Sequence, residues 1–147
     1  MKLNLGCGRK QREDCINIDH NDFGQQVIME LEKEPLPYKD NTVDYVRADH
    51  FLEHLNDCRH LLNEVWRVLK PEGEFEIYVP YGLWDKQFSP VHKQIITEHW
   101  FSWLERDDNE EYYGYKRWKI KEISTAVNDV GNKYEIHCIM QKYEKKD

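Results

Sequence analysis

The feature that most constrains the fold is a short apolar strand that runs straight into a glycine turn. Residues 2–5 (Lys-Leu-Asn-Leu) are followed at once by Gly6-Cys7-Gly8. Glycine adopts backbone conformations that other residues avoid, so this pair allows a tight turn and a close approach of the main chain to a ligand. A helix beginning after the turn would add unpaired N–H groups. The pattern therefore predicts a ligand-binding turn at the end of a strand, without identifying the ligand.

A second strand-like segment follows the turn and ends in a carboxylate. Residues 15–19 place two isoleucines on one face, and Asp19 is the last residue of the segment. Ligands of open α/β sheets bind at the carboxyl ends of adjacent strands, where a carboxylate can accept both hydroxyls of a ribose. The third glycine of a dinucleotide motif is replaced by Gln11, and Asp19 comes only 13 residues after Gly6. A smaller adenosyl ligand therefore fits better than a dinucleotide.

The rest of the chain alternates strand-like and helix-like patterns. Residues 57–69 carry apolar side chains at helical spacing, and Pro71 and Gly73 follow as helix-ending residues. Further strands are expected at 27–31, 42–48, 75–79, 118–127 and 133–143, with a second helix at 94–104. This order predicts an α/β fold with a Rossmann-like, doubly wound, mostly parallel sheet that ends in an antiparallel C-terminal hairpin.

Length and composition limit the classes of protein to consider. The 147 residues suffice for one hydrophobic core, so a single domain over 1–147 is expected. The formal net charge of −7 argues against nucleic acid or an anionic membrane surface as a partner. No apolar run is long enough to span a membrane, and the four cysteines are scattered. We therefore expect a cytoplasmic protein with reduced thiols.

Several short segments of the first 80 residues occur in a characteristic order. They are LNLGCG (3–8), NID (17–19), LPYKDNTVDYV (36–46), FLEHL (51–55) and LLNEVWRVLKPEGEFEIYVP (61–80). Together they resemble the class I S-adenosylmethionine-dependent methyltransferases, in particular the small type 11 group. The resemblance implies a cofactor half at 1–80, a substrate and closing half at 81–147, and S-adenosylhomocysteine as product. The family's helix before the first strand has no counterpart here, so the implied fold is truncated at the N-terminus.

The resemblance also implies which residues contact the cofactor. The glycine turn would line its methionine end, Asp19 with His20 would hold the ribose hydroxyls, and Glu30-Leu31 would meet the adenine. Glu32 competes with Glu30 for the adenine, because the following loop is one residue longer than expected. The segment after the fourth strand would face the methionine portion and the methyl group. The full implied set is Leu5, Gly6, Cys7, Gly8, Asp19, His20, Glu30, Leu31, Ala48, Asp49 and His50.

A competing pattern of metal-binding type lies in the same region. His50, Glu53 and His54 spell HxxEH, which on a helix would place both histidines on one face, as in a class of zinc peptidases. The segment closely follows a predicted strand, and no distal acid in a matching helix stands out as a third ligand. The preferred interpretation is therefore a strand-to-helix corner in which Glu53 and His54 form structural hydrogen bonds, with no metal.

The aromatic segment after residue 80 is the candidate acceptor site. Tyr81 and Trp84 follow the fifth strand, where an acceptor would lie beside the cofactor, and His92 comes shortly after. Aromatic walls favour both a sulfonium and a flat acceptor, although the same side chains could simply close the core. His50 and His92 are the candidate catalytic bases, because imidazole takes up a proton near neutral pH; His99 is a third.

These observations lead to one functional hypothesis with two alternatives. We expect transfer of a methyl group from S-adenosylmethionine to an oxygen or nitrogen of a small-molecule acceptor. The resemblance alone is also compatible with a non-catalytic module that binds S-adenosylmethionine or S-adenosylhomocysteine. A zinc hydrolase based on HxxEH is the third hypothesis. The sequence does not indicate the acceptor or the oligomeric state.

Overall fold

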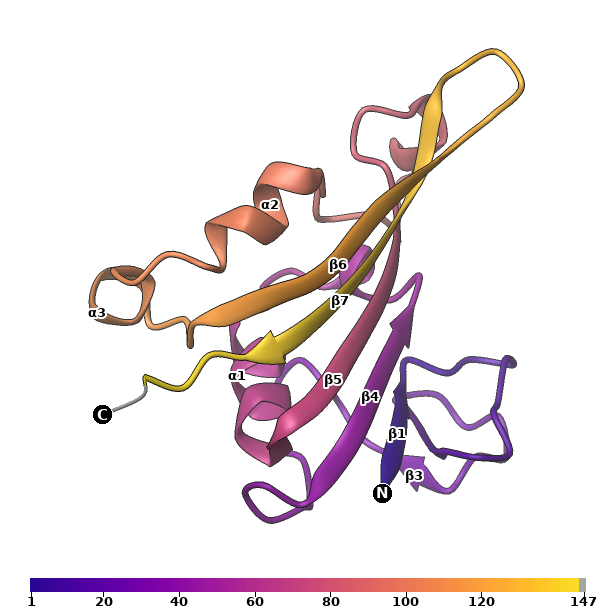
Figure 1. The fold of residues 1–147 in the computed structure, drawn as a ribbon. Coiled ribbons are helices and arrows are strands. Elements are labelled where there is room, and N and C mark those ends of the chain that lie inside the picture. Colours follow the sequence, from indigo (N-terminus) through magenta and orange to yellow (C-terminus); the bar gives the residue numbers. More distant parts are fainter. Residues whose placement is uncertain (146–147) are drawn as a thin grey trace.

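The computed structural model describes residues 1–145, so the last two residues of the expected domain lie outside the described residues. Figure 1 shows one sheet with helices beside it. The elements are β1 (Lys2–Leu5), β2 (Ile16–Asp19), β3 (Val27–Ile28), β4 (Val43–Asp49), the 3-10 turn η1 (Leu52–His54), α1 (Arg59–Val68), β5 (Leu69–Pro80), the 3-10 turn η2 (Asp85–Gln87), α2 (Glu98–Trp103), α3 (Asn109–Tyr113), β6 (Trp118–Val127) and β7 (Lys133–Lys142).

The seven strands form one sheet in the order β3-β2-β1-β4-β5-β7-β6. The pairs β1–β2, β1–β4, β2–β3 and β4–β5 are parallel, whereas β7 is antiparallel to both β5 and β6. The chain adds strands on both sides of β1, because β2 pairs with one edge of β1 and β4 with the other. This confirms the predicted Rossmann-like sheet with an antiparallel C-terminal hairpin. The carboxyl ends of β1, β2 and β4 consequently meet at one edge.

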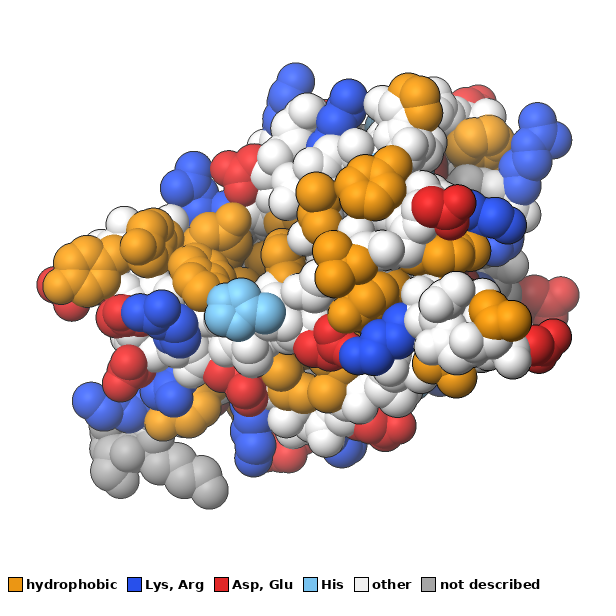
Figure 2. Space-filling model, turned by 90° about the horizontal axis from the view of Figure 1, so that it is seen from above, with side chains coloured by type: hydrophobic (Ala, Val, Ile, Leu, Met, Phe, Trp, Pro, Cys, Tyr) orange, Lys and Arg blue, Asp and Glu red, His pale blue; other side chains and the backbone are white. Residues whose placement is uncertain are grey.

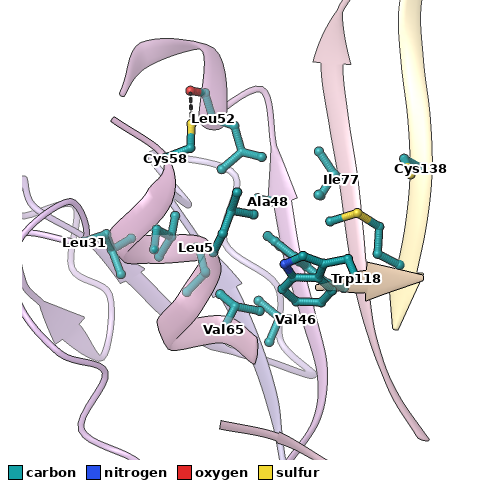
Figure 3. Close-up of a cluster of buried hydrophobic side chains, with 14 of the residues drawn as sticks. Leu5, Leu31, Val46, Ala48, Leu52, Cys58, Val65, Ile77, Trp118 and Cys138 are labelled. Atoms are coloured by element: carbon teal, nitrogen blue, oxygen red, sulfur yellow. Dashed lines mark hydrogen bonds between the residues drawn. The ribbon is translucent and has the colours of Figure 1, made fainter. Parts of the chain in front are cut away.

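The hydrophobic core lies against one face of the sheet. Phe75, Ile77 and Val79 of β5 are fully buried, and they alternate with more polar residues that point to the opposite face. The apolar sides of α1 and α2 join the same core. Figure 3 shows part of it, with Val65 of α1 and Trp118 of β6 among the strand residues. Strands buried on both faces would read as continuous apolar runs, so the alternation in β5 reflects one-sided burial.

The opposite face carries a polar network centred on Glu76. Its carboxylate accepts hydrogen bonds from Tyr45 and from Tyr78, pairs with Arg47 at 3.2 Å and lies 2.7 Å from Nε2 of His137. The Arg47 guanidinium lies over the Tyr78 ring, which also stacks on His137. These contacts satisfy the charged groups, and so this face of the central strands is covered by its own side chains.

The connections before β4 differ from the prediction. Residues 9–15, between the glycine turn and β2, contain no helix, so the helix that would begin after the turn does not form. Asn17 explains the alternative path, because its side chain accepts the Arg12 N–H at 2.8 Å and donates to the Arg12 carbonyl at 3.0 Å. Asn4 donates to the Lys10 carbonyl at 3.1 Å. Amide side chains that bond the backbone in this way compete with helix formation.

The later elements follow the prediction with shifted bounds. The helix expected at 57–69 is α1, and an Asp57 carboxylate oxygen accepts the Arg59 N–H at its start. The strand expected at 75–79 already begins at Leu69, since Leu69 pairs with Val43. The helix expected at 94–104 is shortened to α2, and α3 was not predicted.

All four cysteines are buried and free, and burial raises the pKa of Cys58 and of Cys138 to about 12. Among residues 1–145, none of the helices combines the length and the apolar character that a bilayer crossing requires.

One-sided burial predicts unequal effects for two isoleucines on neighbouring strands. Ile77 of β5 faces the core, whereas Ile139 of β7 lies on the polar face and is partly exposed. We expect Ile77→Ala to lower the free energy of unfolding by about 2–5 kcal/mol, through lost burial and a cavity. Ile139→Ala should cost less than about 1 kcal/mol. Denaturant titrations of both variants measure the difference, and equal losses would contradict a one-sided core.

Candidate functional site

The glycine turn has the tight backbone geometry that its sequence predicts. Gly6 and Gly8 have φ angles of 61° and 49°, in the left-handed region that favours glycine. A Cβ atom on Gly6 would lie 2.2 Å from the ring of Phe51, so the ring packs directly against this glycine. The Cys7 N–H donates to the Ile18 carbonyl at 3.1 Å and fixes the turn to β2.

Asp19 connects the end of β2 to this turn. Its carboxylate is almost buried, and one oxygen accepts the Gly8 N–H at 2.9 Å while the other accepts the Asn21 N–H at 3.0 Å. His20 lies beside it, with Nδ1 3.6 Å from an Asp19 oxygen. Each carboxylate oxygen can accept more than one hydrogen bond, so Asp19 keeps acceptor capacity for a ligand. The turn and the carboxylate therefore form one preorganised unit.

The two acids considered for the adenine occupy different environments. A Glu32 oxygen accepts the Asp57 N–H at 2.8 Å, so Glu32 holds the loop before α1. Glu30 bonds within its own loop, through an oxygen 3.3 Å from the Glu32 N–H. Leu31 is buried in the core, with 2% of its surface exposed. Of the two acids, Glu32 is bonded to the segment before α1, whereas the Glu30 side chain is bonded only within its own loop.

The end of β4 positions three of the predicted residues. Ala48 is fully buried, and an Asp49 oxygen lies 3.0 Å from the Arg47 guanidinium. His50 has a φ angle of 51°, an uncommon conformation for a residue other than glycine. A hollow of about 180 Å³ lies beside this segment, with Gly6, Arg47 and Asp49 among its lining residues.

His50 contacts carboxylates from two other parts of the chain. Its Nε2 is 2.7 Å from Glu135 of β7, and its Nδ1 is 3.6 Å from Glu53 of η1. Its backbone N–H donates to the Tyr78 carbonyl at 2.8 Å, which anchors the left-handed residue to β5. Glu135 was missed by the sequence analysis, because 85 residues separate it from His50 and no local motif marks it.

Glu53 is the most unusual group of the site. It is 1% exposed, and neither side-chain oxygen has a hydrogen-bond partner. Burial raises its pKa to about 7. The prediction that Glu53 forms structural hydrogen bonds was therefore wrong for its side chain. His54, by contrast, does bond the backbone, through Nδ1 and the Val91 carbonyl at 3.1 Å.

The predicted acceptor residues separate into two places. Tyr81 and Trp84 line a hollow of about 600 Å³ next to Lys133 at the β6–β7 hairpin. His92 instead lies beside His54, with 4.8 Å between ring centroids. His99 is exposed on α2 and lines another hollow. Figure 2, seen from above Figure 1, shows hydrophobic side chains in several groups with charged side chains between them.

Known sequences similar to this chain are methyltransferases. The type 11 family, described as a methyltransferase domain, matches residues 12–77. Demethylmenaquinone methyltransferases of Bacillus cereus and Bacillus anthracis are 32% identical in an alignment of 109 residues that covers 65% of this chain. The chain spans 44% of the length of these relatives.

Solved structures match nearly the whole chain. An S-adenosylmethionine-dependent methyltransferase from Archaeoglobus fulgidus has a TM-score of 0.68 at 18% identity, covering 96% of this chain and 85% of that one. One from Methanosarcina mazei has a TM-score of 0.65 at 17% identity, covering 98% and 92%. Residues 12–77 thus match the type 11 methyltransferase family, and the strand order with the glycine turn gives the chain the fold of the class I S-adenosylmethionine-dependent methyltransferases.

Proposed function

We propose that the chain transfers a methyl group from S-adenosylmethionine to an oxygen or nitrogen of a small molecule. The observation that carries the proposal is the hydrogen bond between the Asp19 carboxylate and the Gly8 N–H. It joins the glycine turn and the acid at the carboxyl ends of adjacent strands, where ligands of such sheets bind. A nearly buried carboxylate held in this way needs no rearrangement to accept ribose hydroxyls.

The residues at this edge fit the cofactor. A Cβ atom on Gly8 would meet nothing within 4 Å, so open space adjoins the turn where the methionine end would lie. Asp19 and His20 would bind the ribose, and Glu30 with the Leu31 backbone would meet the adenine. Ala48 and Asp49 would face the methionine portion, beside Leu5 and Cys7. When bound, the cofactor supplies a methyl group already activated by a sulfonium, which leaves alignment and proton removal to the protein.

His50 is the proposed general base. It lies at the end of β4, next to Asp49, on the side where the methyl group would be. Glu135 fixes the ring through Nε2 and compensates the positive charge that forms when His50 takes a proton from the acceptor. This arrangement of a base oriented by a carboxylate supports an O–H or N–H acceptor.

Three observations support a small acceptor, and the first of them favours one with a flat ring. Tyr81 and Trp84 provide aromatic walls beside a hollow large enough for one, and aromatic faces stack on flat molecules. The formal charge of −7 argues against a nucleic-acid acceptor. The demethylmenaquinone methyltransferases act, by their name, on a small molecule, which agrees with this class.

The Asp19 contact gives the first test of cofactor binding. Asp19→Ala should weaken S-adenosylhomocysteine binding about 10- to 100-fold, because hydrogen bonds to a charged acceptor contribute about 1.5–3 kcal/mol. Glu13→Ala, which removes an exposed carboxylate of the same loop, should leave the affinity unchanged. Isothermal calorimetry measures both, with circular dichroism as the check on folding. Absence of binding to the wild type would reject the proposal.

The base is tested with His50→Asn, because asparagine tolerates the left-handed backbone but cannot act as a base. We expect kcat to fall by about 100-fold or more, with S-adenosylhomocysteine affinity within about threefold of the wild type. Release of S-adenosylhomocysteine over a panel of phenols, alcohols and amines gives the rate, and His99→Asn is the matched control. An unchanged kcat would remove His50 from the mechanism. Binding without transfer to any acceptor would favour the non-catalytic module.

A further inference from the structure

A buried carboxylate and two histidines form a cluster that the proposed methyl transfer does not use. Glu53 is 1% exposed and its side-chain oxygens are unpartnered. Burying a carboxylate without a partner is costly, so such groups commonly neutralise or bind a cation. The Glu53 carboxylate faces His54, whose Nε2 is 3.8 Å from Oε1.

The two imidazoles are held in the tautomer that suits a metal. His54 donates through Nδ1 to the Val91 carbonyl at 3.1 Å, and His92 donates through Nδ1 to the Gln87 carbonyl at 2.9 Å. A carbonyl can only accept, so each Nδ1 carries the proton and each Nε2 keeps its lone pair. Metal-binding histidines typically donate their other nitrogen to a backbone carbonyl in this way. Burial lowers the pKa of His54, which also favours the neutral ring.

We propose that Glu53, His54 and His92 bind a divalent transition-metal ion, preferentially zinc. One donor atom from each of the three residues lies within 4.8 Å of the others. Tetrahedral zinc with bonds of about 2.1 Å needs donors about 3.4 Å apart, which small rotations of the two imidazoles provide. Two imidazoles and one carboxylate are a zinc donor set that leaves the fourth position open.

This set differs from the HxxEH pattern of the sequence. η1 spans only Leu52–His54, so the helical face that HxxEH requires does not form. His50 bonds Glu135 through Nε2 while its Nδ1 stays 3.6 Å from Glu53, and His92 from the segment after β5 brings a donor atom within 4.8 Å of Glu53 and His54. The proposed site is thus one that the tertiary fold assembles, whereas the sequence analysis expected no metal.

The ion would join two segments that line the carboxyl edge of the sheet. The Glu53 carbonyl already accepts the N–H groups of Lys93 and Gln94 at 2.6 and 3.1 Å. A metal between Glu53 and His92 would fix the same two segments through their side chains. Binding of the ion would therefore order the loop that follows the candidate acceptor residues, and this effect does not depend on the methyl-transfer proposal.

The test is zinc binding to tag-free protein stripped with a chelator. Titration against a chromophoric competitor should give one zinc per chain with a Kd below about 1 µM. Zinc should also slow hydrogen exchange of residues 87–94, and Co²⁺ should produce the visible absorption of a tetrahedral site. Mg²⁺, which prefers oxygen ligands, should not compete.

Variants separate this site from adventitious binding. His54→Ala, His92→Ala and Glu53→Gln should each weaken zinc binding at least about 100-fold, whereas His99→Ala should not. Because Glu53→Gln removes a buried charge, it is expected to fold, and circular dichroism checks each variant. The proposal would be overturned if the folded wild type bound no zinc at a free zinc concentration 10-fold above about 1 µM, or if the wild type and His92→Ala bound zinc equally well. S-adenosylhomocysteine binding by the same samples reports on the cofactor site separately.

Discussion

Apolar contact between the helices and one face of the sheet holds the fold together. The buried side chains of α1, with Phe101 of α2 and Trp118 of β6, all belong to the same core. Each central strand contributes to this core with every second residue, as Phe75, Ile77 and Val79 do. The strand register, and with it the meeting of the carboxyl ends of β1, β2 and β4, depends on keeping that alternate set inside.

The polar face of the sheet needs no covering helix, whereas helices pack on the other face. Glu76 gathers two tyrosines, an arginine and a histidine around one carboxylate, so the strands present satisfied groups in place of an apolar surface. The same face reaches the site, because Arg47 connects Glu76 to Asp49. The network therefore supports the end of β4 as well as covering the strands.

Local patterns predicted much of the fold but less of the site. Alternation identified β5, and helical spacing identified α1, because both depend on residues close in sequence. The glycine turn and the position of Asp19 at the end of the next strand were predicted for the same reason. The pairing of His50 with Glu135, and the approach of His92 to Glu53, depend on how β7 and the loop after β5 pack. A helix after Gly8 does not form, because the Asn17 side chain bonds the N–H and the carbonyl of Arg12, which a helix would have used.

The contact between Phe51 and Gly6 links the two halves of the site mechanically. The aromatic ring rests on the glycine, and the residue before it is His50, held at a left-handed backbone angle. Two residues further on is Glu53, inside the protein. Any side chain added at position 6 would therefore meet this ring first, and the segment from His50 to Glu53 would have to shift to make room for it. A single substitution in the turn would in this way disturb the proposed base without altering any residue near it in the sequence.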